Sequence, residues 1–328
     1  MDQVNRISFT EEDKTLPFRT ALVTGGAGFI GSYLVEQLIN AGVKCSVLDC
    51  LFHDSLSNLS SVLSGITLHR ADLRSEREVA EVFATTQPEA VFHLAAHHFI
   101  PYCDKHPVDT VETNIIGTQM IADACARFGT KRLFYASTAA VYAPSSQPHN
   151  ESEIPHPPDI YGASKYAGER IVKALSANSR VIVRVGRYFN AVGPRETNLH
   201  IVPEIMRQLM DPEFKALRLG NLFPKRDYVH AADLASGSIR LLSVDTPGNW
   251  DVANIGSGKA ASVADLIGMF EKALGRPIPV ENDPAKTRVS DRPLLVADTT
   301  RMKQVYGWQV RRSLDEAVAE LVETLTTQ

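Results

Sequence analysis

Short apolar runs alternate along the chain with longer stretches in which apolar residues recur every three or four positions. The apolar runs are continuous, as in strands that are buried on both faces of a sheet. They predict strands at residues 20–24, 45–48, 66–69, 90–94, 132–136 and 181–185. The periodic stretches between them, such as 31–40 and 75–85, predict helices. This alternation indicates an α/β fold with a Rossmann-type, doubly wound parallel sheet.

The pattern divides the chain into parts of different character. Residues 1–18 are polar and aperiodic, which predicts a flexible N-terminal extension. Residues 19–187 carry the alternating strands and helices and form the predicted Rossmann domain. Residues 188–328 mainly form a smaller C-terminal lobe, because proline- and glycine-rich connections become common there. We expect segments near 228–256 to return to the larger domain.

Composition narrows the class of protein. Hydrophobic residues at 44% and charged residues at 22% are typical of a globular protein, and the net charge of -4 argues against a nucleic-acid groove. The apolar runs are too short to span a bilayer, and the acidic start lacks the pattern of a signal peptide. The four cysteines show no CxxC spacing, which indicates reduced thiols. We expect a cytoplasmic protein that binds neither nucleic acid nor membranes.

A glycine-rich turn follows the first predicted strand. Gly25, Gly28 and Gly31 have GxxGxxG spacing, and Phe29 and Ile30 begin the helix after it. In such a turn the first glycine allows a tight bend and the second lets the backbone approach a pyrophosphate. The third lets helix and strand pack closely, while the helix N-terminus offers N–H groups. A strand before and a helix after the turn favour dinucleotide binding over a chance glycine pattern.

The ends of the next strands predict an adenosine pocket. Asp49 ends the second strand, 18 residues past the last glycine, where a carboxylate binds a ribose and repels a 2′-phosphate. This favours NAD over NADP; the alternative is an aspartate that only caps the strand. Asp72 and Leu73 follow the third strand, where adenine would lie. Ala95 and Ala96 follow the fourth strand and leave room for a cofactor, unless they are packing alanines.

Tyr161 and Lys165 lie four residues apart, hence on one face of a helix. A phenol with a pKa near ~10 is a poor base at neutral pH. A neighbouring ammonium and a cationic nicotinamide would both favour the phenolate and make it a general base. The YxxxK spacing is common by chance, but here it follows a complete dinucleotide turn.

Several further motifs share one pattern. They are TGGAGFIG at 24–31, STAAVY at 137–142, YGASK at 161–165, RYFNAVGP at 187–194, KRDYVH at 225–230, NIGSG at 254–258, and AD followed by GW between 297 and 308. Together they resemble the extended short-chain dehydrogenase/reductase family, in particular the NAD-dependent nucleotide-sugar epimerases, over about residues 20–310. The resemblance implies NAD as cofactor, a nucleoside-diphosphate sugar as substrate, and a C-terminal lobe that binds this sugar.

The resemblance also implies roles for individual residues. Thr138 would hydrogen-bond the reacting sugar hydroxyl, and Tyr161 would be the base. Lys165 would hold the nicotinamide ribose and lower the pKa of the phenol. Ser137 would lie beside the cofactor.

Substrate-binding residues are implied in the second half of the chain. Asn190 resembles the family's asparagine near the substrate phosphates, and Arg226 and Arg288 resemble its phosphate-binding arginines. Guanidinium groups grip phosphate oxygens with two hydrogen bonds, although a solvated surface ion pair is the alternative for each arginine. We also place Asn198, Leu199 and Leu219 at the substrate. Both leucines would flank the nucleotide base, with ordinary core packing as their alternative.

Two adjacent histidines depart from the family pattern. His97 and His98 follow the fourth strand and should border the sugar, where they could hydrogen-bond its hydroxyls. A metal site would need a third ligand, and the sequence does not identify one, so we expect no metal.

The reaction follows from the residues after Thr138. In the family, 4,6-dehydratases carry an Asp-Glu pair there and uronate decarboxylases a glutamate, whereas this chain has Ala139 and Ala140. Without a carboxylate a second proton transfer lacks its agent, which favours 4-epimerisation. Asn190, where uronate epimerases often carry threonine, and Leu295, at a gatekeeper position, favour a UDP-hexose or UDP-N-acetylhexosamine.

Other interpretations stay open at this point. The chain could be a dehydratase or decarboxylase with acid groups from His97 or His98, a UDP-glucuronate 4-epimerase, or a catalytically silent NAD-binding regulator. Helices near 108–127 and 161–177 resemble the pair that forms a four-helix bundle across a dimer axis, which predicts a homodimer. The alternative is that the smaller lobe covers them.

Overall fold

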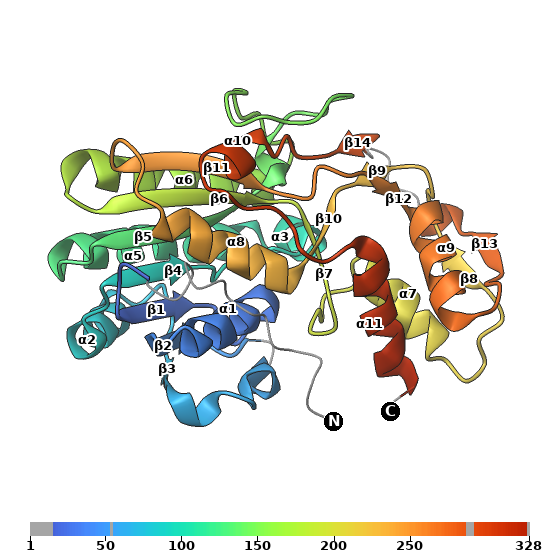
Figure 1. Cartoon of the computed structure of the whole chain (residues 1–328), viewed down its shortest axis with the longest axis horizontal. Coiled ribbons are helices and arrows are strands. Elements are labelled where there is room, and N and C mark those ends of the chain that lie inside the picture. The colour runs from blue at the N-terminus through green and yellow to red at the C-terminus, as the bar shows by residue number, and fades with distance from the viewer. Residues whose placement is uncertain (1–15, 53–54, 287–291, 327–328) are drawn as a thin grey trace.

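In the part of the chain that the structure describes, residues 16–52, 55–286 and 292–326, seven parallel strands form a central sheet (Figure 1). The structure is a computed structural model. The strands, in their order across the sheet, are β11 (Trp250–Ile255), β6 (Ile182–Tyr188), β5 (Arg132–Thr138), β4 (Ala90–His93), β1 (Thr20–Thr24), β2 (Lys44–Asp49) and β3 (Ile66–Arg70). Each predicted strand overlaps one of these, and the predicted fold class is confirmed.

Helices cover both faces of the sheet. The first face carries α1 (Phe29–Asn40) and α8 (Ala231–Ser243), which pack against each other. The other face carries α2 (Glu76–Thr86), α5 (Gly117–Arg127) and α6 (Ile160–Asn178).

Alternate residues of one strand pack into the two hydrophobic cores on opposite faces of the central sheet. In β4, Ala90 and Phe92 pack under α1 and α8, whereas Val91 packs under the α2, α5 and α6 layer. Because successive strand side chains point to opposite faces, a strand covered on both sides must be apolar at every position. This is the physical reason for the continuous apolar runs in the sequence.

The smaller lobe has a hydrophobic core of its own. Its elements are α7 (Ile201–Leu209), β8 (Leu217–Leu219), α9 (Val263–Leu274), β13 (Val280–Asn282) and α11 (Leu314–Thr326). The strands β8 and β13 pair in parallel, and the lobe lies at the right of Figure 1.

Shorter elements complete the fold. They are α3 (Ile100–Lys105), α4 (Pro107–Val111), β7 (Asn190–Val192), β9 (Lys225–Arg226), β10 (Tyr228–His230), β12 (Ala261–Ser262), β14 (Leu294–Leu295) and α10 (Thr300–Gln304). Strand β7 pairs with β10, and β9 pairs with β12 and β14. Strand β11 then pairs with β6, so the chain returns from the smaller lobe to complete the larger sheet.

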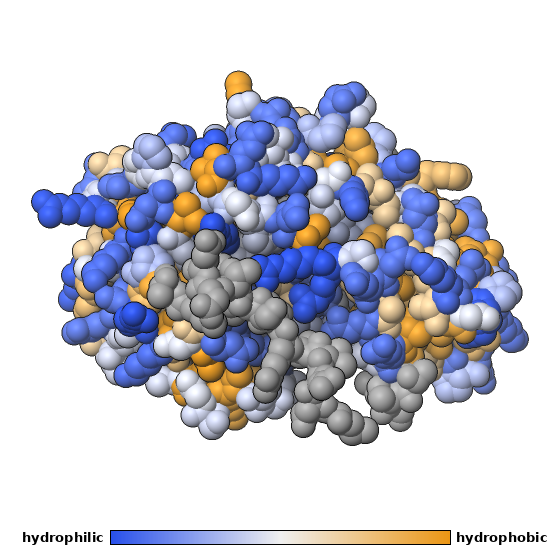
Figure 2. All heavy atoms as spheres, viewed as in Figure 1, coloured by the Kyte–Doolittle hydropathy of each residue, from blue (hydrophilic) through white to orange (hydrophobic). Residues whose placement is uncertain are grey.

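The outer surface is mainly polar on the face that Figure 2 displays. Hydrophilic side chains spread over both lobes there, and hydrophobic ones form scattered groups. Among the described residues, no helix combines the length and the apolar character that a membrane span requires.

Candidate active site

A cleft of about 1330 Å³ lies at the carboxyl ends of the central strands. Sites for drug-sized ligands usually measure roughly 300–1,000 Å³, so this cleft has room for more than one such molecule. Ligands bind at this edge of an open α/β sheet because the strand ends and helix N-termini meet there. The lining includes every residue predicted to bind the cofactor: Gly25, Gly28, Phe29, Ile30, Gly31, Asp49, Asp72, Leu73, Ala95, Ala96, Ser137, Tyr161 and Lys165.

The glycine turn is packed so tightly that side chains would not fit. Gly25 has a φ of 70°, and a Cβ there would lie 2.8 Å from the backbone of Ala95. A Cβ on Gly31 would lie 2.1 Å from the carbonyl oxygen of Gly25. Gly28 precedes α1 and brings no side chain over the first turn of that helix. The result is a backbone cradle at a helix N-terminus, which fits the pyrophosphate of a dinucleotide.

Asp49 holds this turn as well as facing the cleft. Its Oδ2 accepts a hydrogen bond from the N–H of Ala27 at 3.0 Å, and its Oδ1 accepts one from the N–H of Leu51 at 2.8 Å. Asn58 donates to the carbonyl of Ala27 at 3.0 Å. The carboxylate therefore fixes the backbone of the glycine turn and of the residues after β2, which adds a structural task to the predicted binding task.

Thr138 and Tyr161 meet at the floor of the cleft. Thr138 ends β5, and Tyr161 lies in the first turn of α6. Helix α6 begins there because Asp159 accepts the N–H of Gly162 at 2.7 Å as an N-cap. A Cβ on Gly162 would lie 2.6 Å from the carbonyl oxygen of Ala140, so glycine is needed for this approach. The hydroxyl of Thr138 lies near the phenol of Tyr161, close enough to act on its pKa.

Burial controls the two ionisable groups on α6. It raises the pKa of the Tyr161 phenol well above its usual value, and the hydrogen bond with Thr138 opposes this only in part. Burial also lowers the pKa of the Lys165 ammonium to about 7, opposed by the charge of Glu169. The Nζ atom of Lys165 lies 4.4 Å from the ring centre of Tyr135. In the chain alone, burial therefore sets the pKa of the phenol, and Lys165 is not among the groups that lower it.

A buried polar network stands behind these groups, and sequence reasoning missed it. Ser137 donates to Glu169 at 2.5 Å, and Arg187 donates to both carboxylate oxygens of Glu169 at 2.9 and 2.8 Å. Arg187 also donates to the hydroxyl of Tyr142 at 3.0 Å. The network binds α6 to β5 and β6, so it fixes where Tyr161 stands. The available signal was Glu169, an acid four residues after Lys165 on the same helix.

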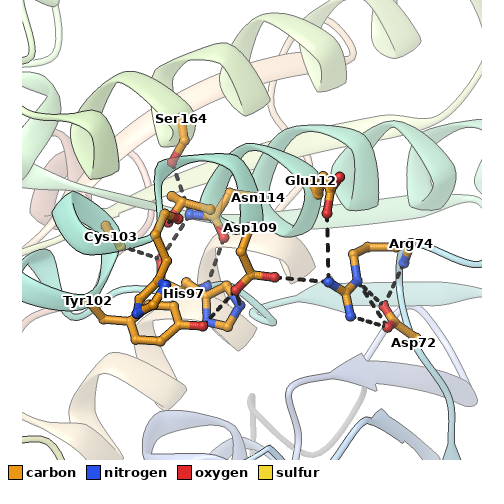
Figure 3. Close-up of polar contacts among 11 residues, drawn as sticks. Asp72, Arg74, His97, Tyr102, Cys103, Asp109, Glu112, Asn114 and Ser164 are labelled. Carbon is orange, nitrogen blue, oxygen red and sulfur yellow. Dashed lines mark hydrogen bonds and ion pairs between the residues drawn. The ribbon is translucent and has the colours of Figure 1, made fainter.

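The loop after β4 is fixed to α6 through one buried side chain. Asn114 lies in a π-helical turn, residues Glu112–Ile116, a kind of turn that is frequent at functional sites. It accepts the N–H of His97 at 2.8 Å and donates to the carbonyl of His97 at 2.8 Å and to Ser164 at 2.9 Å (Figure 3). The peptide of His97 is therefore held in place relative to Tyr161.

An extended polar chain joins this loop to the predicted adenine site (Figure 3). The Nε2 atom of His97 lies 2.9 Å from a carboxylate oxygen of Asp109, and Tyr102 donates to the same oxygen at 2.7 Å. Arg74 bridges the other Asp109 oxygen, at 2.9 Å, to Asp72. Hydrogen bonding to Arg74 lowers the pKa of Asp72. The residues expected at the adenine and at the sugar thus share one network.

The structure separates the predicted substrate residues into groups. Those that line the cleft are His97, His98, Thr138, Asn190 and Arg226. Asn198 contacts His98 at 3.1 Å, and Leu199 is 55% exposed. Leu219 is 2% exposed inside the core of the smaller lobe, so the packing alternative describes it. Arg288 lies outside the described residues.

Arg292 lines the cleft and was missed by sequence reasoning. Nη2 of Arg292 donates to the carbonyl of Ala140 at 3.2 Å. The guanidinium of Arg226 donates to the backbone carbonyl of Arg292 at 2.7 Å. The Nη1 atom of Arg292 is buried and has no hydrogen-bond partner among the described residues. Two guanidinium groups therefore lie close together in the substrate half of the cleft. Only the fold brings Arg292 beside Ala140, because 152 positions separate them.

This dinucleotide cradle and the Thr-Tyr-Lys arrangement define an extended short-chain dehydrogenase/reductase. The family model described as GDP-mannose 4,6 dehydratase matches residues 22–321. The chain belongs to this family of NAD-dependent nucleotide-sugar epimerases and dehydratases, which confirms the predicted family.

Known proteins of the family are similar over most of their length. A UDP-glucose 4-epimerase of Bacillus subtilis (strain 168) is 31% identical over 91% of this chain and 94% of that protein. The structure of a Thermotoga maritima UDP-glucose 4-epimerase with UDP-glucose matches with a TM-score of 0.85 at 28% identity, covering 94% of this chain and 99% of that one. A Bacillus cereus UDP-glucuronic acid 4-epimerase, in complex with UDP-glucuronic acid and NAD, matches with a TM-score of 0.85 at 25% identity and the same coverage.

Proposed function

We propose that the chain is an NAD-dependent 4-epimerase of a nucleoside-diphosphate sugar. The observation that carries this proposal is that Thr138, Tyr161 and Lys165 lie together in the lining of a cleft with a dinucleotide cradle, with the hydroxyl of Thr138 near the phenol of Tyr161. The positions after Thr138 support epimerisation over dehydration or decarboxylation. Ala139 and Ala140 line the cleft there and offer no acid or base for a second proton transfer.

The residues of the cleft would act as a proton relay at the sugar's O4. Tyr161 takes the proton from O4 of the sugar as C4–O4 becomes a carbonyl. After the 4-keto sugar has rotated in the cleft, Tyr161 returns the proton to O4. Thr138 bonds both the phenol and the sugar oxygen, and so holds them in line. NAD, held by the glycine turn, Asp49 and Lys165, would accept the C4 hydride and return it, and its cationic ring would favour the phenolate. Tyr161 is half-buried in the cleft, so the bound cofactor and sugar would exclude water from this transfer.

The sugar is the finer part of the proposal. A UDP-hexose or UDP-N-acetylhexosamine is favoured, because the curated relatives are UDP-glucose 4-epimerases and Leu295 lines the cleft without a bulky aromatic ring. UDP-glucuronate is the second candidate, and Arg292 favours it. The guanidinium lies beside Ala140, where dehydratases of the family carry the groups that act on C5 and C6 of the sugar. A cation at that end of the site fits a C6 carboxylate.

The test is product analysis on a panel of nucleotide sugars. UDP-glucose, UDP-N-acetylglucosamine and UDP-glucuronate are incubated with the purified chain and NAD, and the products are resolved by NMR and mass spectrometry. We expect inversion at C4 with unchanged mass for at least one of them. Loss of water or CO₂ would replace the proposal by dehydration or decarboxylation. Inertness toward the whole panel would contradict it.

The homodimer stays a prediction.

A further inference from the structure

Three side chains with metal-ligating atoms converge at one wall of the cleft. They are His98, Glu196 and His200, and one ligand atom of each lies within 4.8 Å of the other two. His98 follows β4 in the larger lobe, whereas Glu196 and His200 lie in the segment between β7 and α7. All three line the cleft. The fold thus brings together a pair of imidazoles and a carboxylate from segments about a hundred residues apart, which no sequence spacing could indicate.

The carboxylate of Glu196 is only partly hydrogen-bonded. The backbone N–H of Asn198 hydrogen-bonds its carboxylate. The Oε1 atom is buried and has no hydrogen-bond partner among the described residues. A buried carboxylate oxygen without a partner is costly, and a bound cation is one way to stabilise it.

The imidazoles are oriented by their neighbours. The Nδ2 amide of Asn198 lies 3.1 Å from Nε2 of His98, and an amide nitrogen can only donate. Nε2 of His98 therefore accepts this hydrogen bond, and a metal ion at Nε2 would replace the Asn198 amide as the partner of its lone pair. The ring of His200 lies edge-on to Phe99, with ring centres 5.3 Å apart, and 6.1 Å from the ring of His98.

We propose that His98, Glu196 and His200 bind one divalent transition-metal ion, with zinc as the best fit. Two imidazoles and a carboxylate form the ligand set of many zinc sites that keep an open position, whereas magnesium and calcium prefer oxygen ligands. Zinc–ligand bonds of about 2.0–2.2 Å place neighbouring ligands about 3.4 Å apart in a tetrahedron. Side-chain movements on the order of 1 Å would close the cluster to this size.

The ion would have two consequences for the cleft. It would tie the loop after β4 to the start of α7, and so join the lobes across the substrate half. Its open position would face the cleft and could take an oxygen atom of the bound nucleotide sugar. This site is separate from Thr138 and Tyr161, and it goes beyond the proposed reaction, which needs no metal.

Zinc binding by the full-length, tag-free chain tests the proposal directly. The chain is stripped with a chelator, dialysed, and titrated with zinc ions alone by calorimetry, and the bound metal is counted by elemental analysis. We expect one zinc per chain. His200→Gln and Glu196→Gln should each weaken binding by at least about 100-fold, because even residues outside the ligand shell cost 10–100-fold when lost. His156→Gln, at an exposed histidine outside the cleft lining, is the matched control and should bind zinc as the parent does.

Cobalt substitution adds a readout that general misfolding cannot imitate. Cobalt(II) in the parent chain should give intense visible absorption of a four-coordinate site, and both cluster variants should lose it while circular dichroism shows a folded chain. Absence of stoichiometric zinc binding in the parent would overturn the proposal. Equal binding by the parent and both variants would also overturn it. Neither titration contains a nucleotide sugar, so the result is independent of the proposed epimerase activity.

Discussion

The cofactor half and the substrate half of the cleft are built in different ways. In the cofactor half, each predicted residue lies at or just after the carboxyl end of a strand or near the start of α1 or α6, so a short motif places its side chains by local geometry. The substrate half is assembled from the segment after β7, from β9 and from residues beside β14. Its members lie far apart in the chain and depend on how the smaller lobe packs. The residues that sequence motifs can predict are therefore concentrated in the cofactor half of the cleft.

The largest expected effect concerns the motif-built half. Tyr161→Phe should lower turnover by about 10²–10⁴-fold, the usual range for a lost general base. Binding of NAD, measured by fluorescence titration, should change little because the ring and its packing remain. Tyr166→Phe is the control, since this phenol lies on the same helix but outside the cleft lining. A Tyr161→Phe variant with more than a tenth of the parent activity would remove this phenol from the mechanism.

Substitution of Leu219, which was expected in the substrate half, tests whether this residue packs in the core or binds the substrate. Leu219→Ala should lower the free energy of unfolding by about 2–4 kcal/mol, because it leaves a cavity in the core of the smaller lobe. The exposed Leu199→Ala should change it by less than about 0.5 kcal/mol. Urea unfolding of both variants measures this. A Leu219→Ala chain that keeps its stability but loses affinity for the nucleotide sugar would return this residue to the binding site.

The smallest effect is a pH dependence in the cofactor half. Lys165 is buried with a pKa lowered to about 7, below its value in the unfolded chain. Between that pH and the unfolded value the unfolded chain binds more protons, so the contribution of Lys165 to stability rises with pH. Lys165→Met should therefore stabilise the cofactor-free chain by about 1–3 kcal/mol at pH 6. This advantage over the parent should shrink toward pH 9.

Urea unfolding of parent and variant at several pH values measures that difference. A second variant, Lys173→Met, changes a lysine on the same helix that lies outside the cleft lining, and it should show no comparable pH dependence. If the two lysine variants behave alike, burial of the Lys165 ammonium is not the cause.

The same contrast explains how much the sequence could predict. Parallel strands, the glycine turn and the Tyr-Lys spacing depend on neighbours within a few residues, and the structure brings these side chains to one cleft. Arg292 and Glu196 depend on contacts between the lobes, so nothing near them in the sequence marks them. For the same reason the sequence argument paired His98 with His97, whereas the proposed metal cluster joins His98 to Glu196 and His200. Leu219 looked like a binding residue because a buried leucine and a base-contacting leucine have the same local pattern.

Strand β11 has a consequence for how the chain is made. It completes the central sheet beside β6, yet the ribosome delivers it only after β7 to β10 and α8 have been synthesised. Until then the emerging chain presents a bare edge of apolar strand, which is a site for pairing with other chains. Expression of the first 188 residues alone would leave that edge permanently open. Synthesis of the two lobes is thus coupled. The last strand of the central sheet is added only after elements of the smaller lobe have been synthesised.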